Sequence, residues 1–213
     1  MPGSPPIGLV LVDDHPLVLG GLEQLLSTEA DFRVLATCGT VEEAWQAVAA
    51  HRPDVVILDL NLPDESGLAL LRRLDPAAPP AVVVLTASED EDLLLDAARQ
   101  GARGIVLKAM APRMLEDCVR AVHRGELRLQ VNGVDLGERL QERRNVESEL
   151  EGRLTPRELQ ILRLVALRLD NPQIADKLAI SVGTVKIHLH HVYDKLKLQG
   201  RHALQDFLRS KGY

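Results

Sequence analysis

The first half of the chain alternates short apolar runs with longer stretches of helical periodicity. The apolar runs are rich in Val, Ile and Leu and almost continuous in hydrophobicity, which is typical of parallel strands buried on both faces. These runs are Ile7–Val12, Val34–Thr37, Val55–Leu58, Val82–Leu85 and Gly104–Leu107. The helical stretches that follow them are Leu17–Leu26, Val41–His51, Gly67–Leu74, Asp90–Gln100 and Pro112–Arg124. Thr40, followed three residues later by Glu43, predicts a capping box for the second stretch. Five strand–helix repeats predict an α/β domain with a doubly wound, five-stranded parallel sheet.

Residues 153–213 show helical periods only. The segment Thr155-Pro156-Arg157-Glu158 combines an N-cap threonine, a proline at the first helical position and a glutamate at the third, which predicts a helix start. Asn171-Pro172 and Ser181 open two more helices, and Gly200 is expected to end the third. Four short helices predict a small all-α domain.

Residues 125–152 separate these two patterns. The stretch is polar, rich in glycine, and ends in the charged run Glu138–Glu151. We interpret it as an interdomain linker with one helix over Leu136–Arg144. The predicted organisation is a first domain at 1–124, a linker at 125–152 and an all-α domain at 153–213.

Charge is distributed unevenly along the 213 residues, whose net charge is −6. Residues 1–124 carry 10 Lys and Arg against 19 Asp and Glu, whereas residues 153–213 carry 11 against 5. A basic tail behind an acidic domain favours nucleic acid as the partner of the tail, although many solvated helical faces are basic as well.

The sequence lacks the features of membrane and secreted proteins. No apolar run approaches the ~18 residues that span a bilayer. Residues 1–6 have neither the basic region nor the cleavage pattern of a signal peptide. Cys38 and Cys118 have no metal-ligand spacing and are expected to be reduced thiols. We therefore expect a cytoplasmic protein without membrane association.

Polar residues follow the predicted strands at their C-terminal ends. Asp13 and Asp14 follow the first strand, Asp59 the third, Thr86 the fourth and Lys108 the fifth. In a parallel sheet of order 2-1-3-4-5, the ligand crevice lies between strands one and three, where the three aspartates would converge. Carboxylates without Cys or His ligands suit Mg²⁺, beside which an aspartate can attack a phosphoryl group. A nearby ammonium and hydroxyl would hold the phosphoryl oxygens.

Four segments together resemble the receiver domains of two-component response regulators, which have a flavodoxin-like fold. They are Val12-Asp13-Asp14-His15-Pro16, Leu58–Pro63 with Ser66-Gly67, Leu85-Thr86-Ala87, and Gly101–Gly104 through Lys108. The resemblance covers about residues 7–124 and implies that Asp59 is the phosphoacceptor. It implies further that Mg²⁺ is bound by Asp13, Asp14, Asp59 and the backbone carbonyl of Asn61, and that the phosphate is contacted by Thr86 and Lys108.

Each of these residues alone has a simpler explanation, such as a helix cap, a turn or a solvated loop charge, and only their joint placement favours a phosphorylation site. Two positions depart from the receiver pattern. Ile105 stands where receivers commonly carry an aromatic switch residue, and Ala109 stands where Pro or Asp often follows the lysine. The phosphorylation chemistry is expected to tolerate both changes, whereas the route by which the signal leaves the site stays open.

The segment from Asn171 to Lys195 has the pattern helix, short turn, helix, with small or apolar residues where the two helices would cross. The second helix, about Val182–Lys197, has an apolar face and a basic face. The apolar face holds Val185, Leu189, Val192 and Leu196, and the basic face holds Lys186, His190 and Lys197. We expect the apolar face to pack inward and the basic face to meet DNA, although a generic amphipathic surface helix has the same periodicity.

A wider set of residues resembles the LuxR-type domain of NarL/FixJ-family regulators over residues 153–209. The set is Leu154–Glu158, Asn171, Ile174-Ala175, Leu178, Ser181, Thr184-Val185-Lys186, His188, Lys195-Leu196 and Arg201. The resemblance implies that Lys186, Ile187 and His190 face the major groove and that Thr184, His188, Lys195 and Arg201 contact phosphates. Departures from the family pattern are Arg168, Pro172 and Gln173. His188, His190 and His191 are not expected to bind a metal, because positions i and i+2 diverge on a helix.

The expected function is therefore that of a response regulator, not an enzyme. It would be phosphorylated on Asp59 by a sensor histidine kinase and would bind double-stranded DNA sequence-specifically, as a homodimer when active. An alternative, to which Ile105 and Ala109 give some weight, is a DNA-binding regulator whose receiver works independently of phosphorylation; the acidic site favours the first hypothesis. A third possibility, an aspartyl-phosphate hydrolase, needs a general-acid Asp two residues after the nucleophile, where Asn61 stands.

Overall fold

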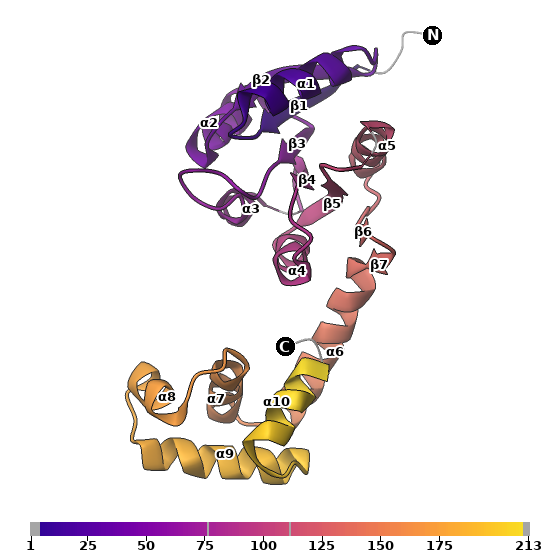
Figure 1. Ribbon diagram of the computed structural model, residues 1–213. Coiled ribbons are helices and arrows are strands. Elements are labelled where there is room, and N and C mark those ends of the chain that lie inside the picture. The colour runs from indigo at the N-terminus through magenta and orange to yellow at the C-terminus, as the bar shows by residue number, and fades with distance from the viewer. Residues whose placement is uncertain (1–4, 76, 111, 211–213) are drawn as a thin grey trace. The chain divides into compact units, whose positions relative to one another are not determined.

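A computed structural model describes residues 5–75, 77–110 and 112–210. The chain divides into two compact units, Met1–Gly137 and Glu138–Tyr213, which are described separately (Figure 1). None of the helices in the described part of the chain combines the length and the apolar character needed to span a membrane.

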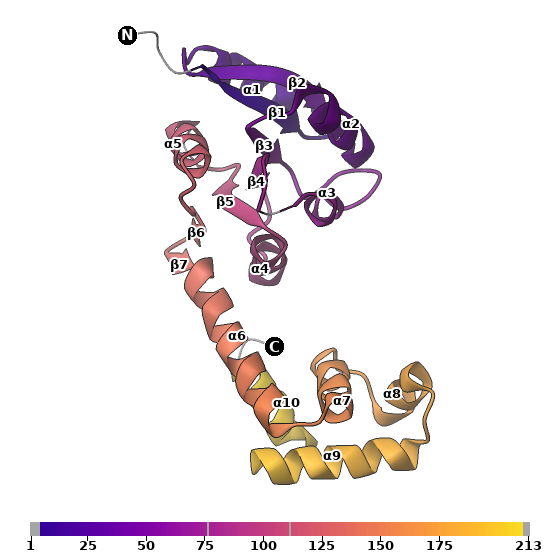
Figure 2. The ribbon, with the colours of Figure 1, turned by 180° about the vertical axis from the view of Figure 1, so that it is seen from behind.

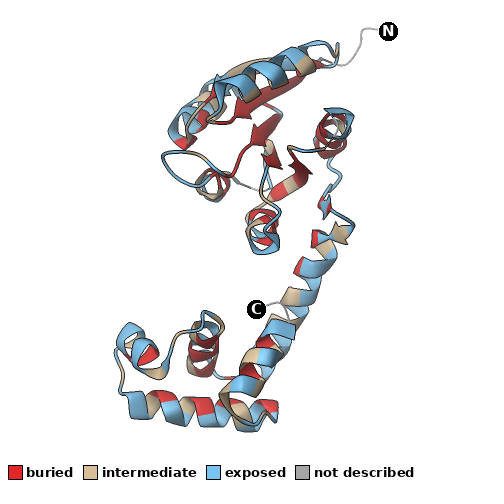
Figure 3. Cartoon of the chain, viewed as in Figure 1, coloured by how far each residue is buried: buried red, intermediate tan, exposed pale blue. Residues whose placement is uncertain are grey.

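The first unit is built on a five-stranded parallel sheet. Its strands are β1 (Ile7–Val12), β2 (Phe32–Cys38), β3 (Val55–Leu58), β4 (Ala81–Thr86) and β5 (Ala102–Leu107). Their order is β2-β1-β3-β4-β5, which confirms the predicted fold class. The three inner strands are buried along almost their whole length (Figure 3), as their continuous hydrophobicity predicts. The edge strand β2 is buried only at its two end residues and is exposed or half-buried between them.

Five helices cover the two faces of this sheet. They are α1 (Pro16–Ser27), α2 (Val41–His51), α3 (Leu68–Arg73), α4 (Glu91–Arg99) and α5 (Pro112–His123). Side chains of α1 and α5 share one apolar core with Leu9 and Leu11 of β1, so these two helices lie on the same face. On the other face, α2 contacts α3, and α3 contacts α4. The sheet is therefore doubly wound, and the C-terminal ends of its strands form one open edge.

The predicted cap of α2 is present in part. The Thr40 hydroxyl accepts a hydrogen bond from the Glu43 N–H at 3.2 Å. The Glu43 carboxylate, however, accepts from the N–H of Gly39 at 2.7 Å. Cys38 and Cys118 are both buried free thiols, and burial raises the pKa of each to about 11.

After α5 the chain returns along the outer edge of β5. The Arg128 N–H donates to the Arg103 carbonyl at 2.8 Å, and the Ile105 N–H donates to the Arg128 carbonyl at 2.9 Å. A small hairpin follows, made of β6 (Gln130–Val131) and β7 (Val134–Asp135). Its turn residues, Asn132 and Gly133, have φ of 49° and 80°, as a type I′ turn requires.

Helix α6 (Leu136–Arg153) extends well beyond the predicted Leu136–Arg144. From Glu138 onward the helix belongs to the second unit, where Leu150 is buried in the core and Val146 packs against it. Most residues of α6 are charged or polar, so its hydrophobic periodicity is weak and its true length was not visible in the sequence. The boundaries of the predicted linker at 125–152 stay a prediction.

The second unit also contains α7 (Pro156–Ala166), α8 (Asn171–Leu178), α9 (Val182–Leu196) and α10 (Gly200–Ser210). Both α7 and α8 pack on α9, as the views in Figures 1 and 2 agree. The capping box of Thr155 and Glu158 is present at the start of α7, and Ser181 caps α9 as predicted. The predicted range of about Val182–Lys197 agrees with α9 to within one residue, and Lys197 takes the left-handed C-cap position with φ of 57°. The prediction that Gly200 ends this helix is wrong, because Gly200 begins α10.

Candidate functional sites

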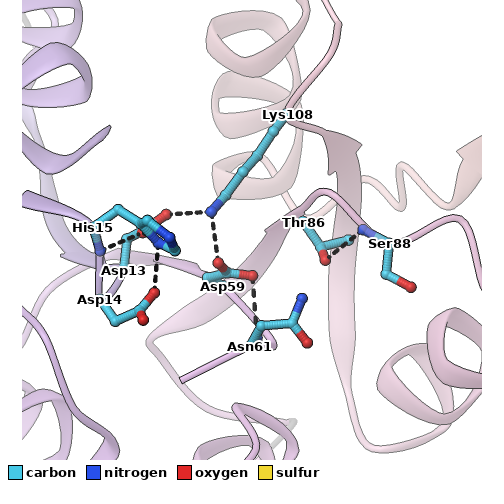
Figure 4. Close-up of polar contacts among 8 residues, drawn as sticks. All are labelled: Asp13, Asp14, His15, Asp59, Asn61, Thr86, Ser88 and Lys108. Atoms are coloured by element: carbon cyan, nitrogen blue, oxygen red, sulfur yellow. Dashed lines mark hydrogen bonds and ion pairs between the residues drawn. The ribbon is translucent and has the colours of Figure 1, made fainter. Parts of the chain in front are cut away.

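The open edge of the sheet brings three carboxylates together. The Asp59 N–H donates to the Val12 carbonyl at 2.8 Å, so the ends of β3 and β1 are tied side by side. Asp13 and Asp59 are each 2% exposed. Ligand atoms of Asp13, Asp14, His15 and Asp59 all lie within 4.8 Å of one another (Figure 4). The convergence expected at the topological switch point is thus present.

His15 is a member of this cluster that the sequence reasoning missed. It is the N-cap residue of α1. Its Nδ1 lies 2.6 Å from Asp14 Oδ1 and 3.1 Å from Asp13 Oδ1, while its backbone N–H donates to Asp13 Oδ1 at 2.9 Å. The sequence signal for His15 was its position directly after Asp13 and Asp14, because a residue at the start of the next helix stays close to the two aspartates that precede it. His15 therefore adds an imidazole nitrogen to the carboxylate oxygens.

Lys108 supplies the counter-charge. Its Nζ lies 2.6 Å from Asp13 Oδ2 and 2.6 Å from Asp59 Oδ2. The loop that carries it is tied to β4, since the Lys108 N–H donates to the Thr86 carbonyl at 2.8 Å. Burial acts to lower the pKa of the Lys108 ammonium, but its interactions with the two aspartates outweigh burial, so this pKa lies above its ordinary value. The lysine is charged and links the two buried carboxylates.

Two further predicted residues lie close to Asp59. The Asn61 N–H donates to Asp59 Oδ1 at 3.2 Å, which turns the chain after β3 back toward the carboxylate. Thr86 is completely buried, and its hydroxyl accepts from the Ser88 N–H at 3.1 Å. In Figure 4, Asp59 lies between Thr86 on one side and the Asp13–His15 segment on the other. The Lys108 ammonium thus contacts the Asp59 carboxylate, and Thr86 ends the neighbouring strand β4.

Gly67 allows the loop after β3 to pack closely against the backbone of Asp59 and Leu60. Its N–H donates to the Leu60 carbonyl at 2.9 Å. A Cβ at this position would lie only 2.3 Å from the carbonyl oxygen of Asp59. Because the atom in the way belongs to the backbone, a side chain here would displace the residue that carries the central carboxylate.

The oxygen donors of the cluster fit a hard divalent cation. Asp13 Oδ2 and Asp14 Oδ1 are buried atoms without a hydrogen bond of good geometry, although Lys108 and His15 lie close to them. Buried carboxylate oxygens that lack full compensation are costly. A cation bound among them would remove that cost, and carboxylates are the ligands that Mg²⁺ prefers.

The second unit presents a separate surface on α9. Its inner face is buried as predicted, with Val185, Leu189, Val192 and Leu196 in the core. On the outer face Lys186 is exposed, Ile187 is 59% exposed and the His190 side chain is 74% exposed. Lys186, Ile187 and His190 are therefore all accessible to a partner. Lys197 lies beyond the helix end and is not part of this face.

The four residues with predicted phosphate contacts differ in their surroundings. Thr184 and His188 are half-buried, and the Thr184 hydroxyl lies 2.8 Å from that of Ser181. The Lys195 Nζ lies 2.7 Å from Glu158 Oε2. The Arg201 guanidinium donates to Asn171 Oδ1 at 2.9 Å and to the Leu169 carbonyl. Lys195 and Arg201 thus have partners within the protein, and their phosphate contacts stay predictions.

Comparison with known families accounts for both units. Residues 9–120 match the response regulator receiver domain, and residues 152–208 match the bacterial regulatory proteins of the luxR family. The oxygen regulatory protein NreC of Staphylococcus epidermidis is 35% identical over 211 residues, which cover 95% of this chain and 97% of NreC. The nitrate/nitrite response regulator NarL of Escherichia coli is 34% identical over 206 residues, 94% of each chain.

Solved structures agree with this assignment. The response regulator ChrA of a heme-sensing two-component system is similar over 98% of both chains, with 33% identity and a TM-score of 0.53. The response regulator RcsB in complex with DNA is similar over 96% of this chain and 98% of RcsB, with 25% identity and a TM-score of 0.57. The chain belongs to the NarL/FixJ family of two-component response regulators, transcriptional regulators that join a receiver domain to a LuxR-type DNA-binding domain.

Proposed function

We propose that Asp59 is the phosphoacceptor and that the donor is a phosphohistidine of a sensor kinase in the cytoplasm. The observation that carries the proposal is the buried group of Asp13, Asp59 and Lys108, held at the ends of three strands. In the transfer, an Asp59 oxygen forms a bond to phosphorus while the P–N bond breaks. The leaving imidazole nitrogen retains the electron pair and takes up a proton.

The neighbouring residues have distinct roles in this proposal. Asp13, Asp14, Asp59 and the backbone carbonyl of Asn61 would hold Mg²⁺, which neutralises charge on the phosphoryl oxygens when bound. The Lys108 ammonium, now shared between two aspartates, would donate to a phosphoryl oxygen. The buried Thr86 hydroxyl would donate to another.

Intact-mass measurement after treatment with acetyl phosphate and Mg²⁺ tests this assignment. The wild-type protein should gain one phosphate, and Asp59→Asn should gain none. Asp54→Asn is a suitable control, because Asp54 lies at the opposite end of β3 and accepts a hydrogen bond from the Gly8 N–H. A phosphate adduct that persists in Asp59→Asn refutes the proposal.

We propose that α9 binds in the major groove of double-stranded DNA. Ile187 would contact a thymine methyl group, while Lys186 and His190 would donate to base edges. Thr184, His188, Lys195 and Arg201 would contact phosphates, which fix the register without reading sequence. When phosphorylated, the protein would bind two half-sites as a homodimer. Its receiver would comprise residues 1–124, its linker residues 125–152 and its DNA-binding domain residues 153–213.

One observation favours a second candidate, a receiver that controls DNA binding without phosphorylation. Ile105 is 3% exposed and purely apolar, so it offers no polar group to Thr86 as a switch partner. The two candidate functions are separated by measuring DNA affinity in three samples, which are wild-type protein with acetyl phosphate, wild-type protein without it, and Asp59→Asn. Equal affinities in all three samples would favour the second one.

A further inference from the structure

Helix α7 begins with a buried carboxylate. Glu158 is the third residue of α7, and only 4% of its side chain is exposed. Its Oε2 accepts from the Thr155 N–H at 2.7 Å, which completes the capping box. Glutamates are rarely buried to this degree unless a positive charge compensates them. The capping box alone therefore does not explain the position of Glu158.

The compensating charge comes from the last turn of α9. Lys195 Nζ lies 2.7 Å from the same Oε2, and His191 Nδ1 lies 3.9 Å from Oε1. Burial acts to raise the pKa of Glu158, but the hydrogen bonds from Lys195 and Thr155 outweigh burial, so this pKa lies below its ordinary value. The pair joins the start of α7 to the end of the helix that carries the exposed face of Lys186, Ile187 and His190.

Lys195 is also held through its main chain. Its carbonyl accepts a hydrogen bond from the Arg153 guanidinium, in the last turn of α6, and Arg153 in turn pairs with Glu149 at 3.2 Å. The Lys195 side chain nevertheless remains 38% exposed. An ammonium has three N–H donors, so one bond to Glu158 leaves donors for an anion from solvent.

We infer that Glu158 is a positioning residue for DNA binding, which holds the Lys195 ammonium where a phosphate of the backbone meets it. This inference rests on the proposed phosphate contact of Lys195. A lysine that is already held loses less rotamer freedom when it binds a phosphate. Through the same contact, Glu158 fixes the end of α9 relative to α7.

Simple electrostatics predicts the opposite sign for the loss of this carboxylate. A negative charge close to DNA repels phosphates, so its removal should strengthen binding. If Glu158 instead positions Lys195, its removal should weaken binding although the protein becomes more positive. The sign of the effect thus separates the two explanations.

The experiment uses full-length wild-type protein, Glu158→Gln, Lys195→Met and the double variant, with a duplex selected by the wild-type protein from a random pool. Glutamine keeps the length and an acceptor oxygen. Asp206→Asn is the matched control, because it removes one acidic charge from an exposed position on α10. Fluorescence anisotropy at several salt concentrations gives the affinity and its salt slope, and circular dichroism verifies folding at the assay temperature.

We expect Glu158→Gln to weaken binding about tenfold and to reduce the salt slope. Lys195→Met should reduce the slope by about 0.9, and the double variant should bind no worse than Lys195→Met. Unchanged or tighter DNA binding by Glu158→Gln overturns the inference. Weaker binding by Glu158→Gln with an unchanged salt slope overturns it as well. So does a double variant whose loss of affinity is the product of the two single losses. Lack of any selected duplex, or an unchanged slope in Lys195→Met, refutes the proposed DNA contact itself.

Discussion

Gly67→Ala tests how closely the loop after β3 must approach the phosphoacceptor site. Gly67 has φ of −52° and ψ of −21°, a conformation open to any L-residue, so backbone strain adds nothing to the cost. The new Cβ, however, would lie 2.3 Å from the Asp59 carbonyl oxygen and 3.0 Å from Leu60 Cα. Carbon and oxygen atoms normally approach no closer than about 3.3 Å. The loop or the end of β3 must therefore shift by about 1 Å.

Two effects follow from that shift. Overpacking of this kind lowers the free energy of unfolding by about 1–3 kcal/mol. A displacement of about 1 Å at a reacting group lowers the rate of its reaction by about 100-fold. We therefore expect Gly67→Ala to fold with reduced stability and to accept phosphate from acetyl phosphate far more slowly than the wild-type protein.

Urea unfolding measures the first effect, and the initial rate of phosphorylation, taken well below the unfolding transition, measures the second. Gly21→Ala is the control, because nothing lies within 4 Å of a Cβ added at this position in α1. It should stabilise the protein by about 0.5–1 kcal/mol and leave the rate unchanged. Phosphorylation of Gly67→Ala at the wild-type rate would refute the steric argument.

Three further changes probe the two sites. Lys108→Met removes the ammonium shared by Asp13 and Asp59, so the unfolding midpoint should fall in EDTA and recover in excess Mg²⁺; a midpoint insensitive to Mg²⁺ would contradict a cation site there. The lowered pKa of Glu158 stabilises the folded state above pH 4.5, and this contribution is lost as the pH falls through the folded-state pKa. Between pH 6 and pH 3, the free energy of unfolding measured in urea should therefore fall less steeply in Glu158→Gln than in the wild-type protein. Identical pH profiles of the two proteins would argue against the Glu158–Lys195 pair. Lys186→Ala should relax base preference at one position of each half-site, by about 1–3 kcal/mol, in a panel of single-base DNA variants; a uniform loss of affinity would mean that α9 is oriented differently.

Sequence patterns predicted the limits of the strands best where all residues of a strand are buried. Strands β1 and β3 have the predicted limits, because every residue in them is buried and all except Gly8 are hydrophobic. The edge strand β2 is longer than predicted at both ends, since Arg33 and Thr37 are exposed and interrupt the apolar run. The β6–β7 hairpin was missed although the pair Asn132-Gly133 is a strong hairpin signal.

Helix ends and the length of α6 depended on contacts that periodicity does not contain. Lys197 adopts the left-handed C-cap conformation and ends α9 before Gly200. Helix α6 continues to Arg153, where Leu150 finds a core to enter. The core that Leu150 enters comes from elsewhere in the chain, so a local pattern carries no information about it. The end of α9 instead rests on local hydrogen bonds from the N–H groups of Lys197 and Leu198.

The sequence by itself determined the parallel α/β sheet, the helical second domain and the meeting of Asp13, Asp59 and Lys108, because the C-terminal ends of parallel strands lie on one side of the sheet. Only the tertiary structure decided which groups touch. It brought Gly67 against the Asp59 carbonyl and joined Glu158 to Lys195 across 37 residues. Such contacts depend on how helices pack on one another, and packing is a property of the folded chain that residue spacing does not encode.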